Sequence, residues 1–198
     1  MKKVYTLLFI GLFALQAAEG QFTKAGGGLG FTTGFPFHQQ TWESNQSTNF
    51  DLFAKGIYEI SVPLHVSPSF TWFIPNITKS TMQAGEEKYV VSAIMFDLNG
   101  HYVFNSLDRF EFYGLAGLDI LLAKRKFVSN IDNYELKEVE KDNAIGLNVG
   151  AGTYIKVTNQ FDLFVEAKYL VSKYDQFMLN AGILLNLQWM SRNENPGL

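Results

Sequence analysis

The chain offers few residues that could perform catalysis or bind a metal. It has three histidines, His38, His65 and His101, and no cysteine, so a thiolate metal site and a disulfide framework are both excluded. No His-Glu-x-x-His motif is present, and the histidines do not cluster at metal-ligand spacing. We therefore expect no metal site, no cofactor and no catalytic residue.

Two glycine-rich segments resemble phosphate-binding loops only superficially. They are KAGGGLG at residues 24–30 and GLNVGAG at residues 146–152. Neither opens an amphipathic helix, and the lysine of a nucleotide-binding P-loop is missing. Glycine inside a strand instead gives bulky neighbours room and permits bending. A nucleotide site is therefore not expected.

Charged residues recur inside apolar stretches, where they could pair with one another. In QFDLFVEAKYLVS, residues 160–172, Asp162, Glu166 and Lys168 all fall in one alternate row, while the other row is uniformly apolar. This period of two is typical of a β-strand, whereas a helix would scatter the three charges around its surface. A strand must therefore position these charges.

The same pattern predicts eight strands along the chain. They cover residues 23–34, 50–60, 64–74, 89–104, 110–124, 144–157, 160–172 and 176–189. The connections after the first, third and fifth strands (35–49, 75–88 and 125–143) are long and polar, whereas those after the second, fourth and sixth are short. This alternation predicts an up-and-down antiparallel meander with two unlike ends.

The composition of the two rows predicts which one faces lipid. The apolar rows carry no charge, whereas the mixed rows combine opposite charges with Gly, Phe, Leu and Asn, as in a lumen filled by side chains. Because lipid tolerates no unpaired backbone edge, we expect an all-β, closed transmembrane barrel of eight strands. The mixed rows would form a lumen ionic network of Lys55, Glu59, Asp97, Glu111, Asp119, Lys156, Glu166 and Lys168, joined by Lys24, Asp51 and Asp162.

The predicted topology also places groups relative to the membrane. With the short turns in the periplasm, both termini are periplasmic, and outward aromatic residues should lie at the two interfaces. These are Tyr58, Tyr102, Phe110, Phe112 and Trp189 on the periplasmic side, and Trp72 and Tyr169 on the outer side. Lys124, Arg125 and Lys126 fall at the outer rim, where they are either lipopolysaccharide contacts, through charge-assisted hydrogen bonds, or a solvated loop base.

This pattern resembles the small eight-stranded outer-membrane barrels of the OmpX and OmpA-domain type, and the porin-like barrels of Bacteroidetes-type bacteria. NAGILLNLQW, residues 180–189, is similar to their terminal-strand assembly signal, with Asn180, Gly182, Leu185 and Leu187 at the matching positions, although the chain continues to residue 198. The resemblance implies the barrel-assembly machinery as a partner.

One short sequence pattern matches a catalytic arrangement known among outer-membrane barrels. His65-Val66-Ser67 matches a His-x-Ser pattern of the lipid A deacylase barrel. The predicted topology places His65 beside a periplasmic turn and facing inward, whereas an enzyme acting on lipid A works in the outer leaflet. We expect no catalysis there.

The N-terminus and the composition indicate export. Lys2 and Lys3 precede an apolar run to about Ala18 and then small residues, which predicts a secretory signal peptide at 1–20, a barrel at 21–189 and a short tail at 190–198. Charged residues make up 18% of the chain, against roughly 25% in soluble domains. The net charge of -3 argues against a nucleic-acid partner.

The sequence thus indicates an integral, non-enzymatic protein of a Gram-negative outer membrane, with a structural, surface-contact or assembly-subunit role. Its expected partners are outer-membrane lipids, lipopolysaccharide and an envelope protein. A small porin that passes ions or solutes is the alternative. A lipid A-modifying enzyme and a soluble lipocalin-like carrier are less favoured, since the carrier would place the apolar row inside the barrel.

Overall fold

The computed structural model describes residues 22–33, 48–82, 85–131 and 134–187, without the side chains of 80–86 and 131–135. The predicted signal peptide, the C-terminal tail, His38 and Trp189 lie outside the described residues. In the described part of the chain, helices of the length and hydropathy needed to cross a membrane do not occur.

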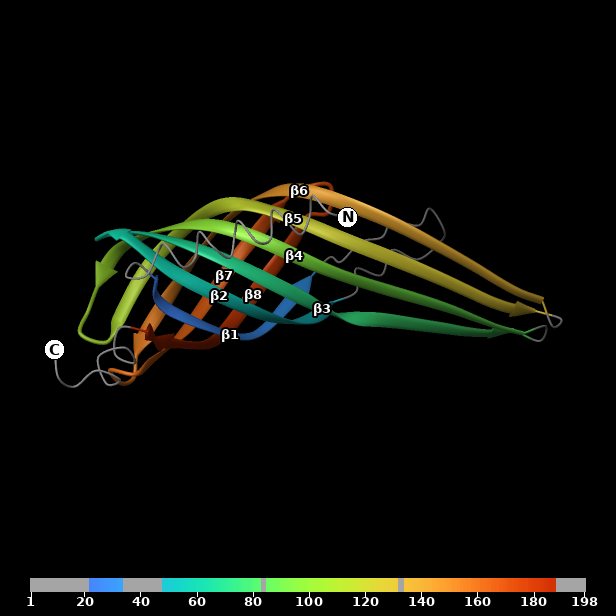
Figure 1. Ribbon diagram of the computed structural model, residues 1–198, viewed down its shortest axis with the longest axis horizontal. Coiled ribbons are helices and arrows are strands. Elements are labelled where there is room, and N and C mark those ends of the chain that lie inside the picture. The colour runs from blue at the N-terminus through green and yellow to red at the C-terminus, as the bar shows by residue number, and fades with distance from the viewer. Residues whose placement is uncertain (1–21, 34–47, 83–84, 132–133, 188–198) are drawn as a thin grey trace, which may run out of the picture.

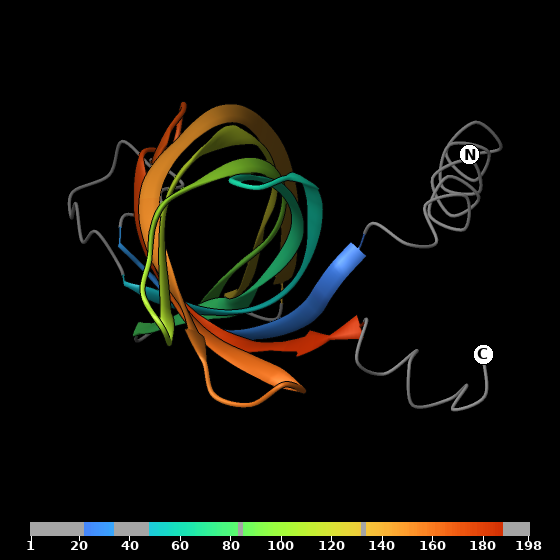
Figure 2. The same ribbon diagram turned by 90° about the vertical axis from the view of Figure 1, so that its left-hand side faces the viewer.

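Eight antiparallel strands follow one another around a closed ring (Figure 2). They are β1 (Phe22–Thr33), β2 (Asn49–Ser61), β3 (Leu64–Met82), β4 (Gly85–Ser106), β5 (Phe110–Ile131), β6 (Tyr134–Lys156), β7 (Phe161–Val171) and β8 (Gln176–Asn186). The ring closes where β1 pairs with β8, with Gly28 opposite Gly182. The prediction of eight antiparallel strands in a closed barrel is confirmed.

Four strands continue well beyond the barrel as a projecting sheet (Figure 1). We use this name for β3 after Ile74, β4 before Ala93, β5 after Ala123 and β6 before Ala144. We call the barrel end from which it leaves the sheet end, and the end with the short β2–β3, β4–β5 and β6–β7 connections the turn end. In the described part of the chain, β6 pairs with β7 only from Leu147 onward, so the sheet has open edges on β3 and β6.

The prediction of long polar loops at 75–88 and 125–143 is wrong, because residues 75–82, 85–88, 125–131 and 134–143 belong to strands. Lys79 lies opposite Lys88, Lys88 opposite Val128, and Val128 opposite Lys137. Polar residues occur in both rows of these segments, so the alternation of apolar and polar residues that marks a membrane strand is lost. The backbone pairing is nevertheless uninterrupted through these hairpins, except for a bulge in β3 between Phe73 and Asn76.

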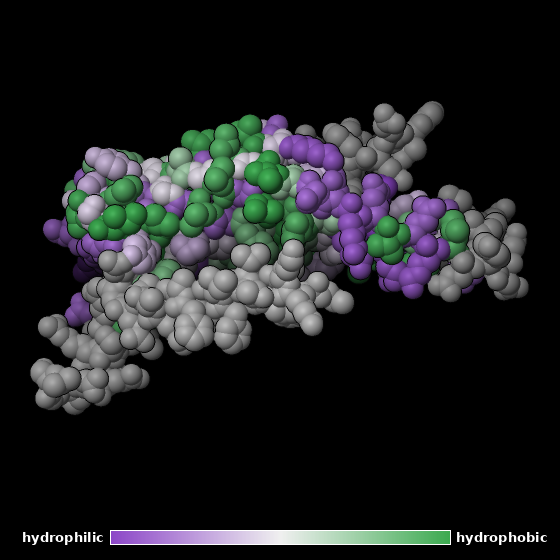
Figure 3. Space-filling view, turned by 45° about the horizontal axis from the view of Figure 1, so that its top comes forward, coloured by the Kyte–Doolittle hydropathy of each residue, from purple (hydrophilic) through white to green (hydrophobic). Residues whose placement is uncertain are grey.

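The barrel has the inside-out polarity that the two rows predicted. In β7, Glu166 and Lys168 are each 2% exposed and point inward, whereas Tyr169 is 43% exposed. In β5, Asp119 is 1% exposed and Leu118 is 55% exposed. On the face shown in Figure 3, hydrophobic side chains gather over the barrel, and hydrophilic side chains dominate over the projecting sheet.

The inward side chains form two apolar clusters with a polar layer between them. The sheet-end cluster consists of Phe73, Ala93, Met95, Leu121, Ala123, Ala144, Leu170, Tyr174 and Met178. The turn-end cluster consists of Phe53, Ile57, Tyr113, Leu115, Tyr154, Phe164 and Leu184. Side chains therefore fill the bore, as an eight-stranded barrel requires.

Candidate functional site

Asp97 of β4 is the centre of the polar layer. The Lys168 ammonium lies 3.0 Å from Asp97 Oδ2, and neither side chain has more than 2% exposure. Ser69 Oγ donates to Asp97 Oδ2 at 2.8 Å, and Asn148 Nδ2 donates to Asp97 Oδ1 at 2.9 Å. Four strands thus meet at one carboxylate, and an ion pair with these extra hydrogen bonds is the form in which a buried charge is tolerated.

Glu166 of β7 organises a second group toward the turn end. Lys55 Nζ lies 2.7 Å from Glu166 Oε2, and the Tyr113 hydroxyl donates to the same oxygen at 2.9 Å. The Tyr113 ring stacks on His101 and on Tyr154, with centroid distances of 4.6 and 4.4 Å. The Tyr154 hydroxyl lies 2.6 Å from His101 Nδ1. This arrangement braces five strands across the bore.

The remaining members of the predicted lumen network lie apart from these two groups. At the turn end, Lys156 pairs with Glu111 at 2.6 Å and Lys24 pairs with Asp162 at 2.5 Å. Glu59 lies opposite His65 in the β2–β3 ladder. The predicted charges therefore all face inward, but they divide into separate groups at different heights rather than one network.

Two buried carboxylates have no hydrogen-bond partner among the described residues. They are Asp51 in β2 and Asp119 in β5, and this holds for both oxygens of each. Each carboxylate lies close to a glycine of the neighbouring strand. A Cβ on Gly30 would lie 2.3 Å from Asp51 Oδ1, and a Cβ on Gly146 would lie 2.5 Å from Asp119 Oδ2. The glycines that sequence reasoning assigned to strand packing therefore create space for polar side chains.

His65 and Ser67 are the described residues that matched a catalytic pattern. His65 and Ser67 both face the barrel interior close to the β2–β3 turn, and Ser67 is fully buried. Among the described residues, clusters of three or more His, Asp or Glu side chains that could hold a metal do not occur. The described residues therefore do not provide the grouped side chains that a transition-metal ion usually needs.

The outer face of the projecting sheet carries a different pattern. Residues directly opposite one another in a ladder share a face, so Lys124 of β5 and Lys141 of β6 lie side by side on the face that continues the outward row of Leu118, Ile120 and Leu122. Lys79 and Lys88 form a second such pair. We call this the lysine face; its members are Lys79, Lys88, Lys124, Lys126, Lys137 and Lys141.

Val90, Val128, Val139 and Ile77 separate these lysines, and acidic residues do not occur among the described side chains of this face. Lysines directly opposite each other repel, which destabilises the strand pair. Five of the six lysine side chains are exposed. Among the described side chains, the lysine face is therefore a row of cations that a multivalent anion would stabilise.

Arg125 lies on the opposite, inner face of the sheet. Its guanidinium pairs with Glu140, beside Glu138 and the contacting rings of Tyr89 and Phe127. Of the three residues predicted to contact lipopolysaccharide, only Lys124 and Lys126 lie on the lysine face. Sequence reasoning missed Lys79, Lys88, Lys137 and Lys141 because their segments were taken for loops. The sequence carried no signal for them, since their common face is set by strand pairing.

The rim between the barrel and the projecting sheet contains one more charged group. Asp142 of β6 accepts hydrogen bonds from Lys173 Nζ at 2.5 Å and from the Tyr174 hydroxyl, both in the β7–β8 turn. The hydrogen bond from Lys173, followed by that from Tyr174, lowers the pKa of Asp142 to about 2. The same Lys173 contact with Asp142 raises the pKa of Lys173. This contact ties the short turn to the base of the long hairpin.

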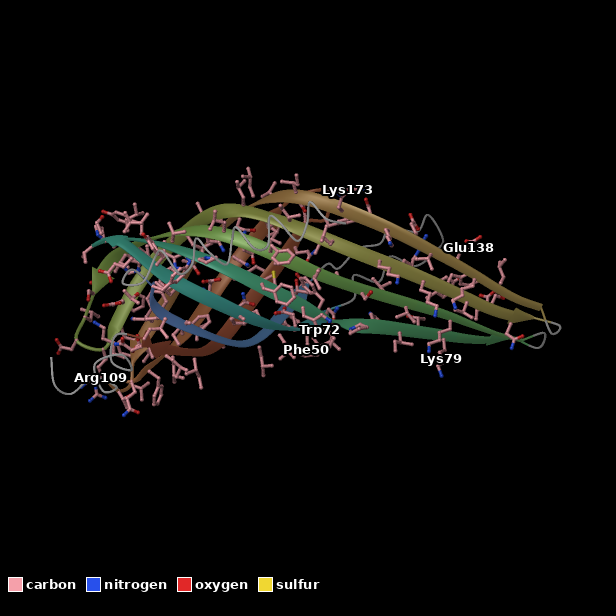
Figure 4. The ribbon with its side chains drawn as sticks, viewed as in Figure 1. Phe50, Trp72, Lys79, Arg109, Glu138 and Lys173 are labelled. Carbon is pink, nitrogen blue, oxygen red and sulfur yellow. The ribbon has the colours of Figure 1, made fainter. Side chains whose placement is uncertain are left out.

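The predicted interface aromatics that the structure describes all point outward. Tyr58, Tyr102, Phe110 and Phe112 lie near the turn end, whereas Trp72 and Tyr169 lie toward the sheet end. In Figure 4, Trp72 lies where the projecting sheet leaves the barrel, and Arg109 lies at the far end of the molecule. In the predicted assembly signal, Asn180 points inward and Leu185 outward, and β8 ends at Asn186, before Leu187.

Comparisons with known proteins agree with this architecture. The family model of the outer membrane protein beta-barrel domain matches residues 5–190. Ail, the attachment invasion locus protein of Yersinia pestis, solved with the heparin analogue sucrose octasulfate, is 17% identical, with a TM-score of 0.54 over 83% of this chain and 98% of Ail. A search of curated proteins returned no match.

Two further solved barrels are similar at a lower level. The N-terminal barrel domain of Pseudomonas aeruginosa OprF is 12% identical, with a TM-score of 0.49 over 84% of this chain and 98% of that one. Neisserial surface protein A is 14% identical, with a TM-score of 0.45 over 82% of this chain and 96% of that one.

Proposed function

The chain belongs to the outer membrane protein β-barrel domain family, and on that premise we propose that it is a non-enzymatic, non-conducting barrel that contacts the lipopolysaccharide layer through its lysine face. The observation that carries the proposal is the continuity of this face with the outward apolar row of the barrel. Leu118, Ile120 and Leu122 lead directly into Lys124 and Lys126 along one face of β5.

The orientation follows from the unlike ends of the barrel. Outer-membrane barrels have short periplasmic turns and longer external segments. The short connections here lie at the turn end, where β1 begins and β8 ends, and the projecting sheet leaves from the opposite end. We therefore infer that both termini are periplasmic and that the projecting sheet is external.

In this orientation the lysines would lie just beyond the last apolar side chains, where anionic headgroups are expected to begin. Lys124 follows Leu122 by two residues, which is ~7 Å along a strand at 3.4 Å per residue. Trp72, Ile94 and Leu122 form the last apolar rung, and Ser92, Lys124 and Lys141 form the next. Lipid phosphates at this level would accept charge-assisted hydrogen bonds from the lysines and relieve their mutual repulsion.

A fold neighbour provides a chemical parallel. Ail was solved with sucrose octasulfate, a sugar that carries many negative charges. A polyanionic sugar is also the chemical class that the lysine face of this chain would bind. The filled bore supports a contact function rather than passage of solutes, because two apolar clusters lie across it. We also propose two protein partners. The barrel-assembly machinery would recognise the signal in β8, and an envelope protein would bind the open edges of the projecting sheet.

The experiment compares two double variants that each remove two cations. K124Q/K126Q removes charge from the lysine face, and R109Q/K156Q removes it from the turn end. With ~1 kcal/mol for each lysine at an anionic surface, the first variant should bind purified lipopolysaccharide roughly 30-fold more weakly than the native protein. Its affinity should also depend less on salt concentration, because fewer counterions are displaced.

The control R109Q/K156Q should bind like the native protein, and lipid A stripped of its phosphates should bind weakly to all three. Equal affinities for the two double variants would remove the lysine face from the proposal.

A further inference from the structure

A second site lies inside the barrel at the sheet end, where β8, β1 and β2 meet. Gly30 of β1 lies opposite Asp51 on one side and opposite Asn180 on the other, and all three residues face the interior. Asp51 is 0% exposed and Asn180 is 4% exposed. The site is built from strands rather than loops, so its geometry is fixed by the ladder.

Three oxygen atoms converge on the space over Gly30. A Cβ at this position would lie 2.3 and 2.4 Å from the two carboxylate oxygens of Asp51, and 2.5 Å from Oδ1 of Asn180. None of these three oxygens has a hydrogen-bond partner among the described residues. A buried carboxylate and a buried amide oxygen that face the same small space without donors are costly unless another group joins them.

The surrounding charges do not neutralise Asp51. Lys168 and Asp97 are the charged groups that act on it, and these two already pair with each other at 3.0 Å. Lys55 is likewise paired with Glu166. The barrel interior therefore contains two buried carboxylates, Asp51 and Asp119, without a matching cation among the described side chains.

We propose that Asp51 and Asn180 hold a hard, oxygen-coordinated cation inside the barrel, with Ca²⁺ as the ion to test. Hard cations take carboxylate and amide oxygens together with waters, and Ca²⁺ accepts flexible, partly hydrated coordination. The site requires Gly30, because any side chain there would occupy the space in which the oxygens converge. This inference is independent of the lysine face, which lies on the projecting sheet, whereas Asp51 and Asn180 lie inside the barrel.

The experiment measures Ca²⁺ binding by the folded, detergent-solubilised full chain after chelator treatment. Calorimetry and the unfolding midpoint are recorded against free Ca²⁺ concentration for the native protein, D51N and D119N. The D51N change keeps the shape and one oxygen but removes the charge, whereas D119N removes the other unpaired carboxylate at a different place. A ligand that binds only the folded state must raise the midpoint as its concentration rises.

The proposal predicts that the unfolding midpoint rises with Ca²⁺ concentration in the native protein and in D119N. In D51N the affinity for Ca²⁺ should fall at least tenfold. N180D, which adds a second carboxylate ligand, should bind more tightly. The proposal would be overturned if the unfolding midpoint of the native protein did not change with Ca²⁺ concentration. Carbon NMR that shows a protonated Asp51 at neutral pH would then explain how the carboxyl group is tolerated without a cation. A response that is equal in D51N and the native protein would also overturn the proposal. Lipopolysaccharide binding should be unchanged in D51N, so failure here leaves the lysine face untouched.

Discussion

Lys168 of β7 and Asp97 of β4 form an ion pair across the bore, with 3.0 Å between Nζ and Oδ2 and almost no exposure of either side chain. Asp97 also accepts hydrogen bonds from Ser69 and Asn148, so four strands depend on its negative charge. Because Lys168 is its cationic partner, the pair is most sensitive to removal of one member alone.

We predict that K168M lowers the free energy of unfolding by about 3–5 kcal/mol, since it leaves Asp97 buried without its partner. The measurement is equilibrium urea unfolding in lipid vesicles. K137M on the projecting sheet is the control and should change stability by less than about 0.5 kcal/mol. The double variant D97N/K168M should recover part of the loss. If K168M lowered the free energy of unfolding by less than about 1 kcal/mol, Asp97 would not be a buried carboxylate that depends on Lys168.

A pair of glycines tests the packing of the bore. A Cβ on Gly152 would lie 2.5 Å from the Tyr113 hydroxyl oxygen, whereas one on Gly114 would meet nothing within 4 Å. G152A must therefore displace Tyr113 from Glu166 and should cost about 1–3 kcal/mol as an overpacked core change. G114A should be close to neutral in the same unfolding assay. Equal effects of the two variants would argue against the inward position of Tyr113.

The Asp142 contact predicts a titration in strong acid. Its pKa of about 2, lowered mainly by the Lys173 hydrogen bond, means that the ionised carboxylate is favoured in the folded protein. The stability from this contact is therefore present above the ordinary value of 3.8 and is lost as pH falls through about 2. Carbon NMR of the Asp142 carboxyl should show this midpoint, and K173Q should move it upward. An unchanged midpoint in K173Q would show that the contact is absent.

The filled bore predicts no conductance. Phe73, Met95 and Met178 lie fully buried across the sheet end of the lumen, and the turn-end cluster lies across the other. Purified protein in planar bilayers should give no reproducible current steps. Reproducible steps whose size changes in F73A would establish the porin alternative instead.

The fold was predictable from sequence wherever a strand has one apolar row and one row that contains polar residues. Asp162, Glu166 and Lys168 alternate with apolar residues, and the structure places the charges inside and Val165 and Tyr169 outside. The same reasoning failed beyond Ile74 and Lys124, because polar residues occur in both rows of these segments. Strand pairing there depends on partners in the neighbouring hairpin rather than on a visible period.

The candidate sites were predictable only in part, because they depend on contacts between strands that are far apart in the sequence. Alternation assigned each charge to the interior, but the pairing of Lys55 with Glu166 and of Lys168 with Asp97 depends on how strands separated in the sequence face each other across the bore. The lysine face needed the corrected length of β3–β6, and the Asp51–Asn180 site needed the closure of β1 on β8. Composition contains neither piece of information.

The absence of cysteine permits a direct test of the central claim, which is that the apolar row lies in lipid and the lysine face begins at the headgroups. Spin labels on single-cysteine variants L118C, K124C and K137C would be measured in bilayers that contain lipopolysaccharide. We predict that collisions with oxygen dominate at position 118, that collisions with a water-soluble nickel chelate dominate at 137, and that position 124 is intermediate. A label at position 118 that is as accessible to the chelate as one at 137 would contradict the account.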